Sequence, residues 1–137
     1  MSDNDLPTPV PTVWPSVSFT DVDAGVRFLT DVLGFVVTAL YRDDDGTVAH
    51  AEARWPDGGG VMFGSRGKPG EWGTIGAAGV YVVAADAATV EAAWRRAQAA
   101  DGVEVTTPLS AREYDPATFS VRDRDGNLWS VGTYRGE

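Results

Sequence analysis

Hydrophobic and polar positions follow one succession of patterns twice along the chain, with the two copies about 66 residues apart. Each copy begins with a strand-like stretch, continues with apolar residues at helical spacing, and ends in three strand-like stretches separated by turn residues. Asp57-Gly58 precedes the last strand of the first copy, and Asp125-Gly126 precedes that of the second. The pattern predicts two βαβββ units with a cleft between them, where ligands favour concave surfaces.

In the first copy, alternation over residues 13–20 predicts a half-buried strand. Asp21 or Asp23 is expected to cap the helix that follows, by accepting hydrogen bonds from its free backbone N–H groups. Gly34 is expected to end this helix in a left-handed conformation. Three further strands are predicted over residues 35–41, 47–54 and 61–65.

The second copy repeats this order after a glycine-rich connector over residues 67–76. A strand is predicted over residues 77–85 and a helix over 86–100, followed by strands over 103–107, 118–122 and 128–134. Residues 1–12 contain three prolines and indicate a flexible arm. We therefore expect an arm and one domain over residues 13–137, built from module one (13–66), the connector and module two (77–135).

The composition is that of an ordinary globular domain, with 43% hydrophobic and 23% charged residues among 137. Cysteine is absent, which excludes disulfides, thiolate metal sites and a cysteine nucleophile. No apolar run approaches the about 20 residues that span a bilayer, and no leader pattern opens the chain, so we expect a cytoplasmic protein without a membrane partner. The net charge of −9 disfavours a nucleic-acid partner. This charge either attracts a cationic ligand or serves solubility alone.

Three sequence motifs carry a resemblance to a known family: Asp-Val-Leu-Gly-Phe at 31–35, His-Ala-Glu at 50–52, and Val-Arg-Asp-Arg-Asp-Gly-Asn-Leu-Trp at 121–129. The chain resembles, over about residues 13–135, the vicinal oxygen chelate superfamily, which includes glyoxalase I, extradiol dioxygenases, and fosfomycin- and bleomycin-resistance proteins. The resemblance implies an α+β fold in which two βαβββ modules curl their sheets around a cleft, with helices outside. It also implies a homodimer, in which a neighbouring subunit or swapped strands often complete the cleft.

Metal enzymes of this superfamily take their ligands from the first and last strand of each module. The matching positions in this chain fall near Trp14, Met62, Gly79 or Val80, and Ser130. None of the four corresponding strands contains His, Asp, Glu or Cys, whereas a catalytic divalent cation needs several oxygen or nitrogen ligands. We therefore predict no bound metal and no cofactor.

Strand alternation sets His50 and Glu52 on the face opposite Ala49, Ala51 and Ala53. One interpretation is that this pair contacts a ligand or acts as acid and base, and the other is that it forms a solvated strand face. The other residues expected to contact a ligand are Trp14, Ser16, Met62, Trp72, Tyr114, Ser130 and Tyr134, with Trp55 and Tyr81 as further candidates.

Ordinary structural roles remain open for some of these residues. Met62 is equally well explained as core filler, and Trp72 and Trp55 as anchors for loops. Trp94 and Trp129 are expected in the core. Residues 115–118 depart from the family pattern, which leaves any ligand contact from the loop around Tyr114 in doubt.

The leading hypothesis is a metal-free small-molecule binding protein, similar to those that sequester bleomycin-type antibiotics in bacteria. It would capture a hydrophobic or cationic aromatic compound by stacking and by its negative field. The alternative is a glyoxalase-like lyase or isomerase that uses His50 and Glu52 as acid and base. A third possibility is an accessory domain that binds another protein.

Overall fold

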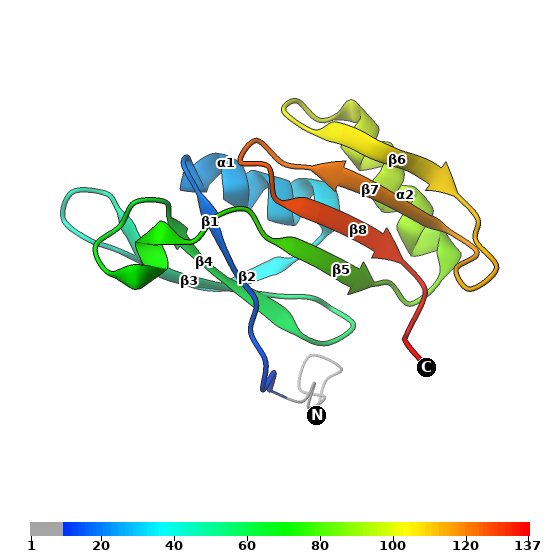
Figure 1. Cartoon of the computed structure of the whole chain (residues 1–137), viewed down its shortest axis with the longest axis horizontal. Coiled ribbons are helices and arrows are strands. Elements are labelled where there is room, and N and C mark those ends of the chain that lie inside the picture. Colours follow the sequence, from blue (N-terminus) through cyan, green and yellow to red (C-terminus); the bar gives the residue numbers. More distant parts are fainter. Residues whose placement is uncertain (1–9) are drawn as a thin grey trace.

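The computed structural model describes residues 10–137, which fold into two four-stranded sheets with helices packed on them (Figure 1). Each half has the order strand, helix, three strands, so the predicted α+β fold of two βαβββ modules is confirmed. Most of the arm expected over residues 1–12 lies outside the described residues. Within residues 10–137, no helix combines the length and the apolar character that crossing a bilayer requires.

The first module consists of β1 (Ser16–Phe19), α1 (Val22–Arg27), the π-helix η2 (Phe28–Leu33), β2 (Val36–Arg42), β3 (Val48–Arg54) and β4 (Gly60–Ser65). Its strands lie in the order β1-β4-β3-β2, with β1 parallel to β4 and the other neighbours antiparallel. β1 is shorter than the predicted strand over residues 13–20. Pro15 precedes it and has no backbone N–H to extend the ladder, although its carbonyl still accepts from the Met62 N–H at 2.9 Å.

The first helix is capped by Asp21 and not by Asp23. Asp21 Oδ1 accepts a hydrogen bond from the Ala24 backbone N–H at 3.1 Å. The Asp23 carboxylate instead pairs with the Arg42 guanidinium at 2.6 Å, which ties the helix to β2. Asp21 directly precedes the helix with an extended backbone, whereas Asp23 lies within its first turn, and this position decides which of them caps the free N–H groups.

The helical stretch of module one widens into a π-helix after its first six residues, where the sequence predicted a uniform α-helix. The Gly34 N–H reaches back five residues to the Leu29 carbonyl at 2.9 Å, as a π-helix requires. The Thr30 hydroxyl bonds the Val26 carbonyl at 2.9 Å and so offers that carbonyl a partner outside the backbone ladder. Gly34 has a φ of 105° and ends the helix as predicted.

The second module consists of the connector 3₁₀-helix η3 (Glu71–Thr74), β5 (Gly79–Val83), α2 (Ala87–Ala99), β6 (Glu104–Ser110), β7 (Thr118–Arg122) and β8 (Leu128–Gly132). Its strand order β5-β8-β7-β6 repeats that of the first sheet, again with a parallel first pair. β5 and β8 end earlier than predicted, so Tyr134 lies beyond its strand, whereas β6 is longer than predicted. Asp86 caps α2 by accepting from the Thr89 N–H at 2.9 Å.

The two modules share one core, in which aromatic rings from both halves are in contact. Phe28 of η2 packs on Trp129 of β8 with ring centroids 5.8 Å apart, and Phe35 packs on Trp55 at 5.0 Å. Trp55 is only 6% exposed, and its indole N–H donates to the Val83 carbonyl of β5 at 2.7 Å. Of the two interpretations of Trp55, these contacts support the anchor and not the cleft wall. Trp129 is core as predicted, and Trp94 packs on Phe119.

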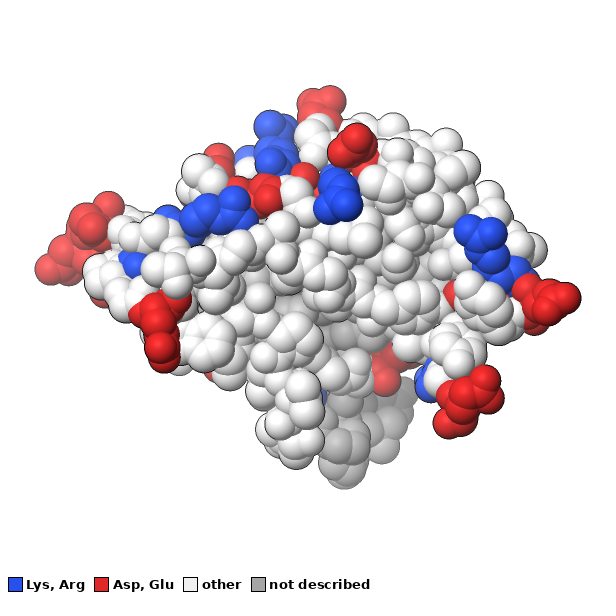
Figure 2. Space-filling view, in the orientation of Figure 1, with Lys and Arg blue, Asp and Glu red and all other residues white. Residues whose placement is uncertain are grey.

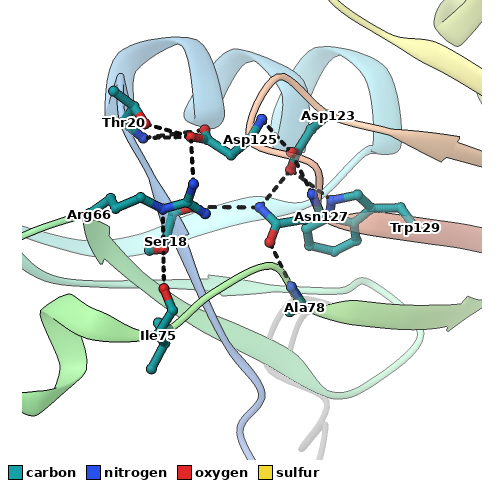
Figure 3. A network of polar contacts seen from close by, with 9 residues as sticks. All are labelled: Ser18, Thr20, Arg66, Ile75, Ala78, Asp123, Asp125, Asn127 and Trp129. Atoms are coloured by element: carbon teal, nitrogen blue, oxygen red, sulfur yellow. Dashed lines mark hydrogen bonds and ion pairs between the residues drawn. The ribbon is translucent and has the colours of Figure 1, made fainter.

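The turn between β7 and β8 is held together by Asp123, which belongs to the third sequence motif (Figure 3). Its Oδ1 accepts from the backbone N–H groups of Asp125 and Asn127 at 2.9 and 3.0 Å. Its Oδ2 accepts from the Asn127 amide and from the Trp129 indole N–H, each at 3.0 Å. This largely buried carboxylate is thus fully engaged within its own turn.

The same turn joins the second module to the first through Asn127 and Asp125 (Figure 3). The fully buried Asn127 side chain accepts from the Ala78 N–H at 2.9 Å, and its amide N–H points at the Ser18 carbonyl at 3.4 Å. Asp125 accepts from the backbone N–H and hydroxyl of Thr20 at 3.1 and 2.6 Å and lies 3.5 Å from the Arg66 guanidinium. The motif therefore sets the position of one module relative to the other.

Candidate small-molecule-binding surface

The predicted residues of the first module share the sheet face that turns away from the core. Ala51 and Ala53 are fully buried on the opposite face, while the side chains of His50 and Glu52 are 38% and 32% exposed. Glu52 lies opposite Met62, and Met62 lies opposite Ser16, which makes a continuous row across β3, β4 and β1. Ser16, Tyr41, His50, Glu52 and Met62 together are called here the first polar face.

His50 and Glu52 form a close pair on the first polar face. His50 Nε2 lies 2.8 Å from Glu52 Oε2, and the imidazole stacks on Tyr41 with ring centroids 6.4 Å apart and planes 11° apart. A carboxylate on one ring nitrogen fixes which nitrogen carries the proton in the neutral imidazole, so the other nitrogen is the proton acceptor. The pair is arranged either to bind a polar or cationic group or to take up a proton.

The second module repeats this row with different chemistry. Tyr81 of β5 lies opposite Ser130 of β8, Ser130 lies opposite Ser120 of β7, and Ser120 lies opposite Thr107 of β6. The Ser120 and Ser130 hydroxyls lie 2.6 Å apart. Tyr81, Thr107, Ser120 and Ser130 are called the second polar face, which carries hydroxyl groups where the first carries an imidazole, a carboxylate and a thioether.

A cluster of tyrosines closes the end of the second polar face. The Tyr81 hydroxyl donates a short hydrogen bond to Asp115 and accepts one from the Tyr134 backbone N–H at 3.1 Å. Burial, followed by the bond to Asp115, raises the pKa of Tyr81 to about 12. The Tyr134 and Tyr114 rings meet edge to face, 5.4 Å apart. Asp115 is a hub of this cluster, although the sequence indicated it only as a departure from the family pattern.

Two predicted tryptophans lie apart from these rows. Trp14 precedes β1, is partly buried, and packs against Gly60, where an added Cβ would overlap its ring. Trp72 lies in η3 of the connector and is 58% exposed. The structure thus brings Ser16, His50, Glu52 and Met62 onto one sheet face, and gathers Ser130, Tyr114 and Tyr134 at the other sheet.

The described residues do not fit a catalytic metal. The two polar faces offer the His50 imidazole, the Glu52 carboxylate, a thioether and several hydroxyls. Neutral hydroxyls are weak ligands for a catalytic divalent cation, so one imidazole and one carboxylate do not make up its ligand set. Among residues 10–137, no three His, Cys, Asp or Glu side chains gather at one point. Of the four positions that match the family's metal ligands, Met62 and Ser130 lie in the two rows. The other two, Trp14 and Gly79 or Val80, lie outside them.

Two pockets lie outside the rows of the polar faces, except that Tyr81 of the second polar face lines one of them. One of about 680 Å³ is bordered by α1, the turn after α2 and the turn between β7 and β8, and its buried carboxylate Asp123 is already engaged by its own turn. The other, of about 270 Å³, lies between Trp55 and β5. Neither is lined by a residue predicted to bind a ligand except the further candidates Trp55 and Tyr81.

Comparisons with known proteins agree with the fold. The sequence model of the Glyoxalase/Bleomycin resistance protein/Dioxygenase superfamily matches residues 13–131, which confirms the resemblance drawn from the motifs. The structure of TioX from Micromonospora sp. ML1 is similar, with 28% identity, a TM-score of 0.67, and coverage of 89% of this chain and 98% of that one. No curated protein matches the sequence.

More distant solved structures share the fold at lower identity. Lactoylglutathione lyase from Agrobacterium tumefaciens has 18% identity and a TM-score of 0.61, and covers 90% of this chain and 94% of its own. The fosfomycin resistance protein FosX from Listeria monocytogenes has 13% identity and a TM-score of 0.59, with 90% of each chain covered. One fold therefore carries several chemistries, and the function must be argued from this chain's own residues.

Proposed function

Because the chain belongs to the Glyoxalase/Bleomycin resistance protein/Dioxygenase superfamily, we propose that it is a metal-free small-molecule binding protein that captures a hydrophobic or cationic aromatic compound. The observation that carries this proposal is the pair of matched rows on the two polar faces. They present aromatic rings, hydroxyls, a thioether and one His–Glu pair, in place of a set of metal ligands. Such groups hold a ligand by contact and hydrogen bonding.

Exposed aromatic side chains support an aromatic ligand. The exposed aromatic residues are Tyr41 on the first polar face, Tyr81 on the second, Tyr114 beside the second, and Trp72 in the connector. Flat aromatic rings favour stacking and cation–π contacts worth roughly 0.5–2 kcal/mol each. The Glu52 carboxylate and the net charge of −9 favour a positive charge on the ligand. Capture of an antibiotic in the bacterial cytoplasm by this means would give resistance without turnover.

A homodimer would complete this binding site. In a single chain, the side chains of both polar faces are partly exposed to solvent. A second copy facing them would supply an opposite wall for the ligand. Light scattering coupled to size-exclusion chromatography measures the mass directly. A dimer near twice 14.5 kDa supports this arrangement, and a monomer that binds ligand with undiminished affinity contradicts it.

Metal analysis and ligand titration test the function. We expect purified protein to contain no stoichiometric metal and to show no thermal shift with Zn²⁺, Ni²⁺, Mn²⁺ or Fe²⁺. Calorimetric titration with the planar cation proflavine should show saturable binding that weakens when Glu52→Gln removes the carboxylate. Asp57→Asn, in the exposed turn after β3, is the matched control for the loss of one negative charge. Stoichiometric metal, or binding of anionic aromatics alone, would contradict the proposal.

The second candidate function is that of a lyase or isomerase, and the 2.8 Å contact between His50 and Glu52 favours it. In this reaction class, His50 would transfer the proton and Glu52 would orient its ring. Turnover of a glyoxalase-type substrate that disappears in both His50→Ala and His50→Gln would support this function. Ligand binding without turnover would favour capture instead, provided that wild type and both variants bind a set of ligands in the same order of affinity.

A further inference from the structure

Asp115 is an almost completely buried carboxylate in the loop between β6 and β7. It is 1% exposed, although its neighbours Tyr114 and Pro116 are exposed. Its Oδ1 accepts from the backbone N–H and the hydroxyl of Thr133 at 2.9 and 3.0 Å, and its Oδ2 accepts the short hydrogen bond from Tyr81. Burial alone would raise the pKa of this carboxyl, but the hydrogen bonds from Tyr81 and Thr133 outweigh it and hold the pKa below its ordinary value.

These bonds draw three separate segments of the chain to one point. Tyr81 comes from β5, Thr133 and Tyr134 follow β8, and Tyr114 is the neighbour of Asp115 in its loop. Gly132 makes room for the arrangement, because a Cβ there would overlap both the Asp115 carboxylate and the Tyr81 hydroxyl. The Tyr134 N–H then bonds the Tyr81 oxygen, which fixes the backbone from which the Tyr134 ring projects.

The rings themselves remain open to solvent. Tyr114 is 63% exposed and Tyr81 is 42% exposed, while the Tyr114 and Tyr134 rings meet edge to face at 5.4 Å. The Tyr81 hydroxyl is already bonded on both sides, so what this residue offers a ligand is the surface of its ring. Figure 2 shows that Lys, Arg, Asp and Glu side chains lie mostly around the margin of this face, with few over β5 and β8.

We propose that Asp115 is a positioning residue that holds Tyr81, Tyr114 and Tyr134 as a preformed stacking subsite for a planar aromatic ring of the ligand. This inference rests on the proposed binding function and adds the part of the ligand that the second module recognises. Side chains that are fixed before binding lose less conformational entropy when the ligand arrives, so a buried carboxylate without any ligand contact raises affinity. Selection is by flatness, because the three side chains of the subsite present ring surfaces to the ligand.

Two cations of equal charge and different shape test this subsite. Proflavine is a planar tricyclic cation, and dicyclohexylammonium is a saturated, non-planar one. Wild-type protein should bind proflavine more tightly than dicyclohexylammonium. Tyr114→Ala should weaken proflavine binding about tenfold, the size of one lost aromatic contact, and should change dicyclohexylammonium binding little.

Asp115→Asn should weaken proflavine binding to a similar extent, because its amide nitrogen cannot accept one of the hydrogen bonds that the carboxylate accepts. Asp57→Asn is the control with the same change of charge. If Asp115→Asn does not fold by circular dichroism, Tyr81→Phe takes its place, since it removes the bonds of the hydroxyl and leaves the carboxylate with Thr133. The ratio of the two affinities is the decisive readout, because general loosening of the fold would weaken both cations alike.

The outcomes separate this inference from the function on which it rests. If wild-type protein binds neither cation nor any other aromatic compound, the proposed function fails and the subsite fails with it. If proflavine binds but Tyr114→Ala and Asp115→Asn bind it as tightly as wild type, the function stands and the subsite is refuted. If Tyr114→Ala instead turns a dimer into a monomer, the tyrosines cover a subunit interface, which also overturns the subsite.

Discussion

Replacing Asn127 with alanine tests whether the turn between β7 and β8 holds the two modules in position. Asn127 is fully buried and makes two well-formed side-chain hydrogen bonds, from the Ala78 N–H at 2.9 Å and to Asp123 Oδ2 at 3.0 Å. A neutral bond contributes about 1 kcal/mol, and a bond to a charged group about 1.5–3 kcal/mol. The contact with the Ser18 carbonyl, at 3.4 Å, adds little. We therefore expect Asn127→Ala to lower the free energy of unfolding by about 3 kcal/mol.

Urea denaturation followed by tryptophan fluorescence measures this loss, because Trp129 lies in the shared core and bonds Asp123. Gln98→Ala is the matched control: it removes an exposed amide from α2, and we expect a change within about 0.5 kcal/mol. Asn127→Asp keeps an acceptor for Ala78 but sets a second carboxylate against Asp123. It should destabilise strongly at pH 7 and recover as the pH falls and one of the two carboxyls takes up a proton. A loss below about 1 kcal/mol for Asn127→Ala would refute the assignment of the turn as the junction between the modules.

Three further predictions concern the Asp115 cluster. Because the pKa of Tyr81 is raised to about 12, the absorbance of tyrosinate should show one component that titrates near that pH, and Tyr81→Phe should abolish it. The contribution of Tyr81 to the free energy of unfolding is present below the unfolded pKa of about 10 and is lost as the pH rises through about 12. The pKa of Asp115 is lowered, so wild type should be more stable than Asp115→Asn above pH about 3.9, and this difference should shrink as the pH falls through the folded pKa. An equal difference at pH 2 and pH 7 in denaturation curves would contradict the hydrogen bonds of Asp115 with Tyr81 and Thr133. Gly132→Ala should cost about 2 kcal/mol in urea denaturation, because its Cβ overlaps Asp115 and Tyr81, whereas Gly76→Ala meets nothing within 4 Å and should be close to neutral.

The family motif at residues 121–129 has a structural role in this chain. Its side chains Asp123, Asp125 and Asn127 bond the turn, β1 and the strand start at Ala78, and none of them lies on a polar face. This explains why the motif predicts the fold and leaves the activity open. A turn that fixes two modules against each other can accompany any chemistry placed on the sheets.

Alternation along β3 was sufficient to predict that His50 and Glu52 lie together on the face that turns away from the core. Because side chains of a strand alternate between its two faces, Ala51 and Ala53 pack into the core and leave His50 and Glu52 on the other side. Ala49 does not share their burial as expected, because a register shift between β2 and β3 gives the buried position to Val48. On the hydroxyl-rich second face, the sequence indicated Ser130 and, as a further candidate, Tyr81. It did not indicate Ser120, because its place beside Ser130 depends on strand register, which the sequence leaves open. The sequence left two roles open for Trp55 for a related reason: a strand-end tryptophan can turn inward or outward. The bond to the Val83 carbonyl across the module boundary holds it inward.

The sequence by itself determined the repeat, the order of elements, the end of the first helix at Gly34, and the face of β3 on which His50 and Glu52 lie. These follow from local spacing, turn residues and backbone freedom, which act over a few residues. Only the tertiary structure decided that Asp115, Tyr81 and Tyr134 meet, and that Asn127 reaches Ser18 and Ala78. Such contacts join residues 34 to 109 positions apart, so they depend on how the sheets twist and pack, and no local pattern encodes them.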